Sequence, residues 1–166
     1  MELWDLYNDK RERTGRTIQR GIPLNSGEYH LVVFAIIMNT NGEVLITKRT
    51  PNKTFPLHWE ITGGAALSGD DSETAVLREI QEEIGLSFKF GEGKCIKTFV
   101  QKSDFSYFGD IWLFQKEVDL SEITFQAEEV CDVRLASKAD LEALIQEGRF
   151  VKNDNVIGAI LEVLNL

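Results

Sequence analysis

An α/β fold, in which helices cover a mixed sheet, is predicted by three features of this sequence. Apolar, β-branched runs of strand length recur along the chain, and two of them, residues 29–38 and 43–49, are joined by an Asn-Gly turn signal. Apolar residues at helical spacing follow helix-capping residues elsewhere in the chain. The 166 residues, of which 43% are hydrophobic, suffice for one domain with a buried core.

The strands are expected in the following order. Residues 4–8 and 14–19 flank the charged turn DKRER and predict a small N-terminal hairpin. The two β-branched runs on either side of the Asn-Gly turn come next. Further strands are predicted at residues 59–62, 88–100, 107–117 and 131–135.

Helices are predicted at one internal position and at the end of the chain. Asp70 or Asp71 is expected to cap the internal helix, which runs to about Ile84 before Gly85 ends it. Near the end of the chain, the Ser137 capping box predicts a helix that ends at Gly148. The last helix is marked by apolar residues at helical spacing, namely Ile157, Ile160, Leu161 and Leu164.

Composition excludes several classes of function. Lys and Arg number 18 against 27 Asp and Glu, and the net charge of −9 argues against broad attraction to nucleic acid or to an anionic membrane. Cys95 and Cys131 lack the spacing of a zinc site and are expected to be reduced core thiols. The first residues have no hydrophobic signal core, so a cytoplasmic protein is expected. A phosphate-bearing ligand would need a cation.

The most informative segment is the internal helix, where Glu79, Glu82 and Glu83 stand at i, i+3 and i+4. Their carboxylates therefore project from one patch. Two carboxylates roughly 6 Å apart repel by on the order of 3 kcal/mol at an effective dielectric of about 20. Mg²⁺ or Mn²⁺ would offset that repulsion, because both ions prefer carboxylate oxygens and bridge protein to phosphate. The patch lies beside an apolar seam formed by Val76, Leu77, Ile80 and Ile84.

The segment GGAALSGDDSETAVLREIQEEIGL resembles the signature of the Nudix hydrolases, GX5EX7REUXEEXGU, where U is a bulky aliphatic residue. One position departs from the pattern: Asp70 stands where the signature has glutamate, which keeps the charge and shortens the side chain. The matching residues are Gly64, Arg78, Glu79, Ile80, Glu82, Glu83, Gly85 and Leu86.

The resemblance implies a Nudix-type α/β/α sandwich with a mixed β-sheet. The chain would form a single Nudix domain over residues 1–166, with the signature at residues 64–86 of a core spanning 28–136. Residues 1–27 would be an N-terminal hairpin extension, and residues 137–166 would hold the C-terminal helices. The implied activity is hydrolysis of a nucleoside diphosphate linked to another moiety, or of a related diphosphate.

The resemblance also implies roles for individual residues. Glu79, Glu82 and Glu83, helped by a backbone carbonyl at or near Gly63, would ligate Mg²⁺ or Mn²⁺, and Arg78 would brace these acids. Glu82 is the candidate general base. Other family members draw the base from a later loop, for which the candidates here are Glu128 and Glu129, with Asp104 and Asp110 behind them.

Basic residues before the signature could bind the phosphates of a substrate. Lys48, Arg49 and Lys53 precede the glycine pair, and together with Gly64 they are the predicted substrate-binding residues. The alternative is that the first two end an exposed strand. Trp59 is expected to be a core anchor.

Two other functions remain open. The N-terminal hairpin and RTPNKTFPLHW resemble isopentenyl-diphosphate isomerases, but the cysteine those enzymes use as the acid is missing from residues 63–66. A non-catalytic Nudix module that binds a nucleotide ligand is the third reading, although the acids are complete. The expected partner is a small-molecule diphosphate, and a homodimer is expected as the commonest assembly.

Overall fold

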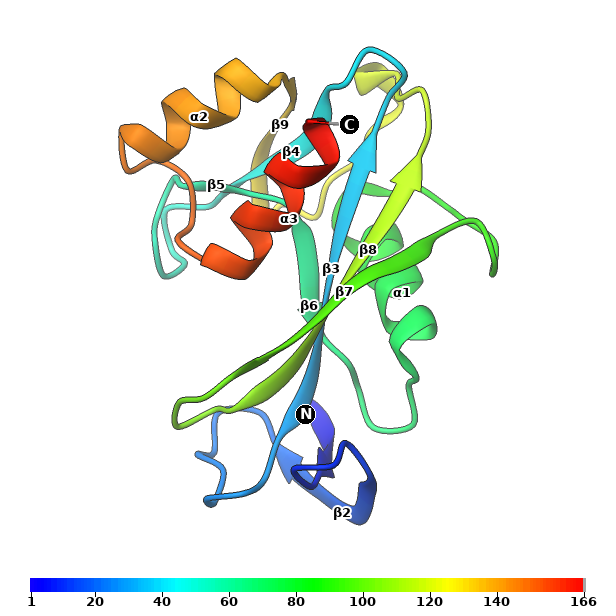
Figure 1. The fold of residues 1–166 in the computed structure, drawn as a ribbon, viewed down its shortest axis with the longest axis vertical. Helices are drawn as coiled ribbons and strands as arrows, with labels where there is room; N and C mark the ends of the chain where they lie inside the picture. The colour runs from blue at the N-terminus through cyan, green and yellow to red at the C-terminus, as the bar shows by residue number, and fades with distance from the viewer. Residues whose placement is uncertain (166) are drawn as a thin grey trace.

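A computed structural model describes residues 1–165 of the chain. A mixed sheet lies between one helix on one face and two helices on the other, which confirms the predicted α/β/α sandwich (Figure 1). The elements in chain order are β1 (Leu3–Tyr7), β2 (Arg13–Gln19), β3 (His30–Met38), β4 (Val44–Arg49), β5 (Trp59–Glu60), β6 (Thr62–Ala65), α1 (Ser72–Ile84), β7 (Lys94–Gln101), β8 (Tyr107–Gln115), a 3-10 turn (Leu120–Glu122), β9 (Val130–Ala136), α2 (Lys138–Gln146) and α3 (Asp154–Leu164).

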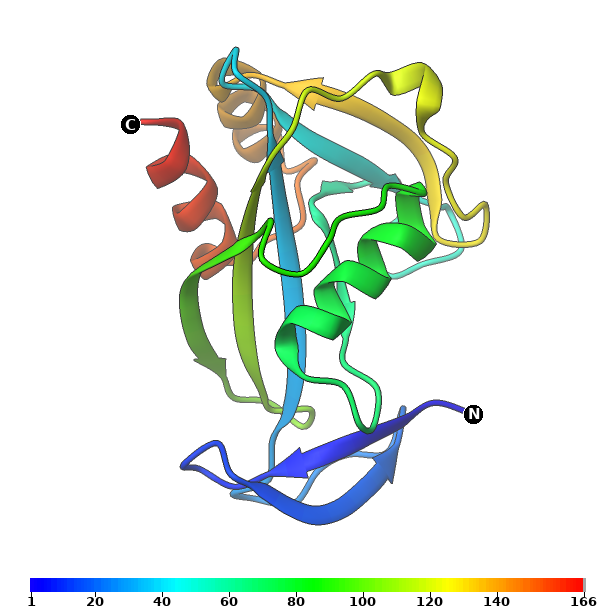
Figure 2. The ribbon, with the colours of Figure 1, turned by 90° about the vertical axis from the view of Figure 1, so that its right-hand side faces the viewer.

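The main sheet follows the order β5-β4-β3-β8-β7, with β6 paired to β3 and β9 paired to β4. Only β3 and β8 run parallel among the pairs in the described residues, so the sheet is mixed. Strands β3 and β4 pair only at Met38 and Val44, and from there the two strands diverge (Figure 2). Strand β6 takes the place beside the first half of β3, and its glycines thereby come to lie under α1.

Helix α1 covers one face of the sheet, and α2 and α3 cover the other (Figures 1 and 2). The seam predicted for α1 is confirmed: Val76, Ile80 and Ile84 are fully buried, and Leu77 packs beside them. Each face has its own apolar core, so the two layers of helices are anchored independently. No helix in residues 1–165 combines the length and the apolar character that crossing a bilayer requires.

The caps of α1 explain where the helix begins and ends. Asp71 is the N-cap, and its side chain accepts a hydrogen bond of 2.8 Å from the Thr74 amide. Gly85 ends the helix in the left-handed conformation, with φ of 73°. Of the two predicted caps, Asp70 is thus free for a different contact. The capping box of Ser137 and Asp140 is also confirmed.

Two expectations from the sequence are wrong. The strand expected over residues 88–100 begins only at Lys94, because Phe88 packs against the core from a loop instead of from the sheet. Cys95 and Cys131 are exposed free thiols, not core thiols. Each lies on a strand, β7 or β9, that is paired on one side only.

The N-terminal hairpin of β1 and β2 forms a separate two-stranded sheet, as predicted, and an ion pair with a buried carboxylate fixes it to the core. The guanidinium of Arg11 donates to both carboxylate oxygens of Asp110, at 2.8 and 2.5 Å. Asp110 lies on β8, and its side chain is only 3% exposed. Burial alone would raise the pKa of Asp110, but the hydrogen bonds from Arg11 and Thr98 hold it below its usual value.

Arg11→Ala should lower the free energy of unfolding by about 3 kcal/mol, because Asp110 would remain buried without its partner. Urea unfolding measures the effect. Arg16 is a matched control, since it lies on the same hairpin and its side chain remains 64% exposed in its 2.6 Å pair with Glu28. Arg16→Ala should cost about 1 kcal/mol or less. Equal losses in the two variants would contradict this role of the buried pair.

Candidate active site

A cleft of about 290 Å³ brings together most of the residues predicted for the site. Its floor is formed by β6 and α1, and its rim is formed by the N-terminal hairpin and two loops, residues 50–58 and 124–129. The residues that line it are Glu2, Arg20, Lys53, Gly63, Gly64, Ala65, Leu67, Arg78, Glu79, Glu82, Glu83, Gln126 and Glu129.

Arg78 binds the acids on either side of it. Its guanidinium lies 3.1 Å from Glu79 Oε1, 3.3 Å from Glu82 Oε2 and 3.0 Å from Asp70 Oδ2. The same group donates to the backbone oxygen of Ala65 at 3.3 Å, which ties the helix to β6. Asp70, the shorter acid in the signature, therefore still reaches the arginine.

Burial raises the pKa of two glutamates in the cleft, Glu79 and Glu83. It raises the pKa of Glu79 to about 7, and Arg78 opposes that rise only in part. It raises the pKa of Glu83 well above its usual range, and the neighbouring charges of Glu79 and Glu60 push it further in the same direction. Glu83 takes part in none of the ion pairs formed within residues 1–165. The cleft therefore holds carboxyl groups whose ionised forms lack enough positive charge.

The donor set fits a hard divalent cation. Carboxylate oxygens of Glu79, Glu82 and Glu83 and a backbone carbonyl at Gly63 are the ligand types that Mg²⁺ and Mn²⁺ prefer. Within residues 1–165 no three acidic, histidine or cysteine side chains already surround a common point. Arg78 binds two of the three carboxylates, so an ion would have to compete with the arginine for them.

Gly63 and Gly64, on β6, each lie too close to a neighbouring group to accommodate a side chain, and that group differs between them. A Cβ at Gly63 would lie 2.5 Å from the backbone oxygen of Val33, on the neighbouring strand. A Cβ at Gly64 would instead lie 2.5 Å from the carboxyl carbon of Glu79. Gly63 is thus required by the sheet, whereas Gly64 leaves space for the Glu79 carboxylate.

Substitution of the two glycines should separate folding from activity. Gly64→Ala should displace the Glu79 carboxylate and lower turnover by roughly ten- to a hundredfold, with little loss of stability. Gly63→Ala should lower the free energy of unfolding by about 1 to 3 kcal/mol, because backbone must move. The free energy of unfolding in urea and the turnover rate are measured for both variants and compared. A Gly64→Ala enzyme with full turnover would contradict the proximity of this residue to the reacting groups.

The predicted basic residues are divided between two faces of the sheet. Lys53 lines the cleft and forms an ion pair with Glu129, the predicted later base. Lys48 lies on the opposite face, 5.7 Å from the ring centre of Trp59, which is buried as predicted. Arg49 is bound by Glu60 at 2.7 Å and by the backbone oxygen of Thr54 at 2.6 Å. Neither Lys48 nor Arg49 is among the residues that line the cleft.

The remaining candidates lie outside the cleft. Glu128 is exposed on the neighbouring loop, and Asp104 is exposed beside a separate cavity. Asp110 is held by Arg11, as described above. Outside this set of candidates, the His30 ring is buried against Trp4, with the two ring centres 3.9 Å apart.

Sequence reasoning missed three lining residues that lie outside the signature segment: Glu2, Arg20 and Gln126. None of them stands near the signature in the sequence, because folding brings the hairpin and the later loop to α1. It also missed Glu60, whose charge acts on Glu83. No local pattern of residues marks these positions.

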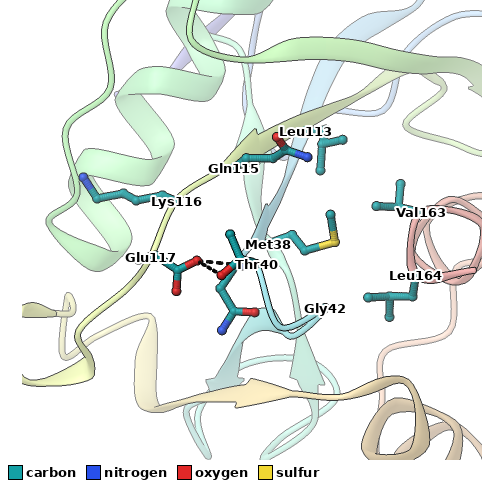
Figure 3. A pocket seen from close by; sticks show the side chains of 10 residues that line it. Met38, Thr40, Gly42, Leu113, Gln115, Lys116, Glu117, Val163 and Leu164 are labelled. Carbon is teal, nitrogen blue, oxygen red and sulfur yellow. Dashed lines mark hydrogen bonds between the residues drawn. The ribbon is translucent and has the colours of Figure 1, made fainter. Parts of the chain in front are cut away.

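A second, larger cavity of about 600 Å³ lies beside α3 at the ends of β3 and β8 (Figure 3). Its walls are mainly apolar and include Met38, Leu113 and Val163. The carboxylate of Glu117 at its rim accepts hydrogen bonds from Thr40. Because it contains no cluster of acids, its size does not make it the better candidate for chemistry on phosphates.

The sequence and the fold of this chain were both compared with those of known proteins. A sequence model of the NUDIX domain matches residues 28–155. An uncharacterised Nudix hydrolase of Listeria monocytogenes is 42% identical over 158 residues, which cover 91% of this chain and 89% of that protein. An isopentenyl-diphosphate Delta-isomerase of Corynebacterium diphtheriae is 28% identical, covering 91% of this chain and 75% of its own length. The crystal structure of DR0079 from Deinococcus radiodurans matches with a TM-score of 0.77 at 24% identity, covering 98% and 99% of the two chains.

Proposed function

Because this chain belongs to the Nudix hydrolases, which cleave diphosphate linkages, we propose that its cleft hydrolyses a nucleoside diphosphate linked to another moiety, or a related diphosphate. The proposed cofactor is Mg²⁺ or Mn²⁺. The observation that carries the proposal is the gathering of Glu79, Glu82 and Glu83 in one cleft, two of them with pKa values raised by burial.

The charge of the cleft supports the proposal. Its lining contains five carboxylates and three cationic side chains, which leaves two negative charges when all are ionised. One divalent cation would neutralise that excess. When bound, such an ion would polarise a phosphoryl oxygen and lower the pKa of a coordinated water.

The predicted residues of the cleft then have the following proposed roles. Glu79 and Glu83, with Glu82 and the backbone at Gly63, would hold the cation, and Arg78 would orient the carboxylates through its ion pairs. Glu82 is the proposed general base because its side chain is half exposed, at 50%, and can meet water. Glu129 is the alternative base. Lys53, which pairs with Glu129 at the rim, is the proposed phosphate-binding lysine.

The isomerase reading has one observation in its favour, the 28% identity to the Corynebacterium diphtheriae enzyme. The isomerases that the N-terminal segment resembles use a cysteine as the proton donor, however, and neither Cys95 nor Cys131 lines the cleft. The REUXEE part of the hydrolase signature, Arg78–Glu83, is intact in this chain. These facts favour hydrolysis.

A screen over a library of phosphoanhydrides, with and without Mg²⁺ or Mn²⁺, tests the proposal. We expect metal-dependent release of phosphate or a nucleoside monophosphate from at least one member. Tight binding of a member without turnover of any would support a non-catalytic module instead. Conversion of isopentenyl diphosphate to its dimethylallyl isomer would support the isomerase reading.

A further inference from the structure

The N-terminal hairpin forms one wall of the cleft, although it lies outside residues 28–155 that match the family. Strand pairing places Leu3 opposite Gln19, and beyond that pair the Arg20 amide donates to the Glu2 backbone oxygen at 3.0 Å. Both Glu2 and Arg20 line the cleft with the signature glutamates. The hairpin thus brings an arginine to the reaction site from a distant part of the sequence.

The hairpin is held firmly against the loop that leads into α1. The Ser68 amide donates to the Leu3 backbone oxygen at 2.8 Å. The carboxylate of Asp5 accepts from the Ser68 hydroxyl at 2.8 Å and from the Gly69 amide at 2.9 Å. This loop leads directly into α1, the helix that contains Glu79. The contacts between hairpin and loop therefore fix the position of Arg20 relative to Glu79.

Of the three cationic side chains in the cleft, two are not bound by the acids of the signature. Arg78 is committed to the acids of the signature. Arg20 and Lys53 are each paired with one rim carboxylate, Glu2 at 2.6 Å and Glu129, respectively. The Arg20 pair is well solvated, with the side chain 62% exposed, so little free energy opposes its exchange for another anion.

We propose that Arg20 is a substrate-binding residue that exchanges Glu2 for the diphosphate in the cleft that Lys53 also lines. This inference rests on the proposed function. A guanidinium suits the task because its fork of N–H donors matches phosphate oxygens, and it remains charged at every working pH. Glu2 holds the arginine at the rim while the cleft is empty of substrate and therefore competes with substrate for it.

Arg16, which lies on β2 just before Arg20 in the chain, provides a matched control. It forms an ion pair with Glu28 of the same length, 2.6 Å, and its side chain is equally exposed at 64%. Arg16 does not line the cleft. A loss caused only by removing a surface charge or a surface ion pair from the hairpin would appear in both Arg16→Ala and Arg20→Ala.

Binding of imidodiphosphate, whose bridging nitrogen resists hydrolysis, tests the proposal by calorimetry in excess Mg²⁺. We expect Arg20→Ala to weaken binding by about tenfold or more, and Arg20→Lys to weaken it less. Arg16→Ala should bind like the wild type. Glu2→Gln should tighten binding by about two- to fivefold, because the competing charge is gone. With any substrate found in the screen, Arg20→Ala should raise KM and leave kcat within a few-fold.

Unchanged binding in Arg20→Ala, an equal loss in Arg16→Ala, or no binding of imidodiphosphate by the wild type would overturn the inference. A fall in kcat with unchanged KM would also overturn it. The proposed function has its own test in the phosphoanhydride screen. Metal-dependent turnover there, combined with unchanged binding in Arg20→Ala, would reject the role of Arg20 alone.

Discussion

Glu83→Gln should lower metal-dependent turnover by at least about a hundredfold, the scale expected when a catalytic metal is lost. The reason is the environment of Glu83, a carboxyl group with its pKa raised by burial and with no ion pair among residues 1–165. Glutamine keeps the shape of the side chain but removes the charge that would bind a cation. Glu79→Gln should have a loss of the same order, since Glu79 shares the cleft.

Both variants should remain folded, because a neutral amide costs less to bury than a carboxylate. Far-ultraviolet circular dichroism and urea unfolding check this, and steady-state kinetics measure turnover. Glu142→Gln is the control, because Glu142 lies on α2, on the other side of the sheet, where it pairs with Lys138. Retained activity in both Glu79→Gln and Glu83→Gln would count against this site.

The second large effect concerns stability and pH. Without divalent metal, the contribution of Glu79 to stability should be lost as the pH rises from 4.5 towards about 7, its usual and its folded pKa. Burial of His30 lowers its pKa from 6.5 to about 4 and acts in the opposite direction over much of this range, so the effect of Glu79 is the difference between the wild type and Glu79→Gln. Over that range the folded protein keeps a proton that the unfolded chain has released, so raising the pH favours unfolding. A rise of the Glu79 pKa from 4.5 to about 7 corresponds to about 3 kcal/mol. Glu83 acts in the same direction.

Excess Mg²⁺ should reverse this loss, because the ion binds the ionised carboxylates. Its stabilising effect in urea unfolding should therefore be larger at about pH 8 than at about pH 5. Glu79→Gln removes one of the titrating groups, and its stability should fall less with pH than that of the wild type. Comparing the two proteins cancels the contributions of other groups, such as Asp110, whose lowered pKa favours folding at higher pH.

An effect of Mg²⁺ that is equal at both pH values would contradict this account of the acids. So would a wild type and a Glu79→Gln variant with the same dependence on pH. Ca²⁺ or Mn²⁺ can replace Mg²⁺ in the same measurement to show whether the site accepts other hard cations.

Local patterns predicted the parts of the fold and site that depend on local interactions. The seam of α1, its end at Gly85 and the spacing of Glu79, Glu82 and Glu83 all follow from helical periodicity and capping. The N-terminal hairpin follows from the charged turn between its strands, and the strands around the Asn-Gly turn follow from their β-branched, apolar runs and the turn itself. The match of the signature to a known family added the layered architecture.

Other features depend on tertiary contacts that no local pattern records. Lys48 and Arg49 are adjacent on β4, and since side chains alternate along a strand, they could not both face α1. Which of them does so was decided by the pairing of β4 with its neighbours. Glu2 and Arg20 reach the cleft only because the hairpin docks on the loop at Ser68.

The central claim is that Glu79, Glu82 and Glu83 gather to hold a divalent cation. The most direct test is a crystal soaked in Mn²⁺ and measured at the manganese absorption edge. We predict an anomalous peak within bonding distance of the Glu79 and Glu83 carboxylates. A map with no manganese at these side chains, or with manganese bound only elsewhere on the protein, would contradict the claim.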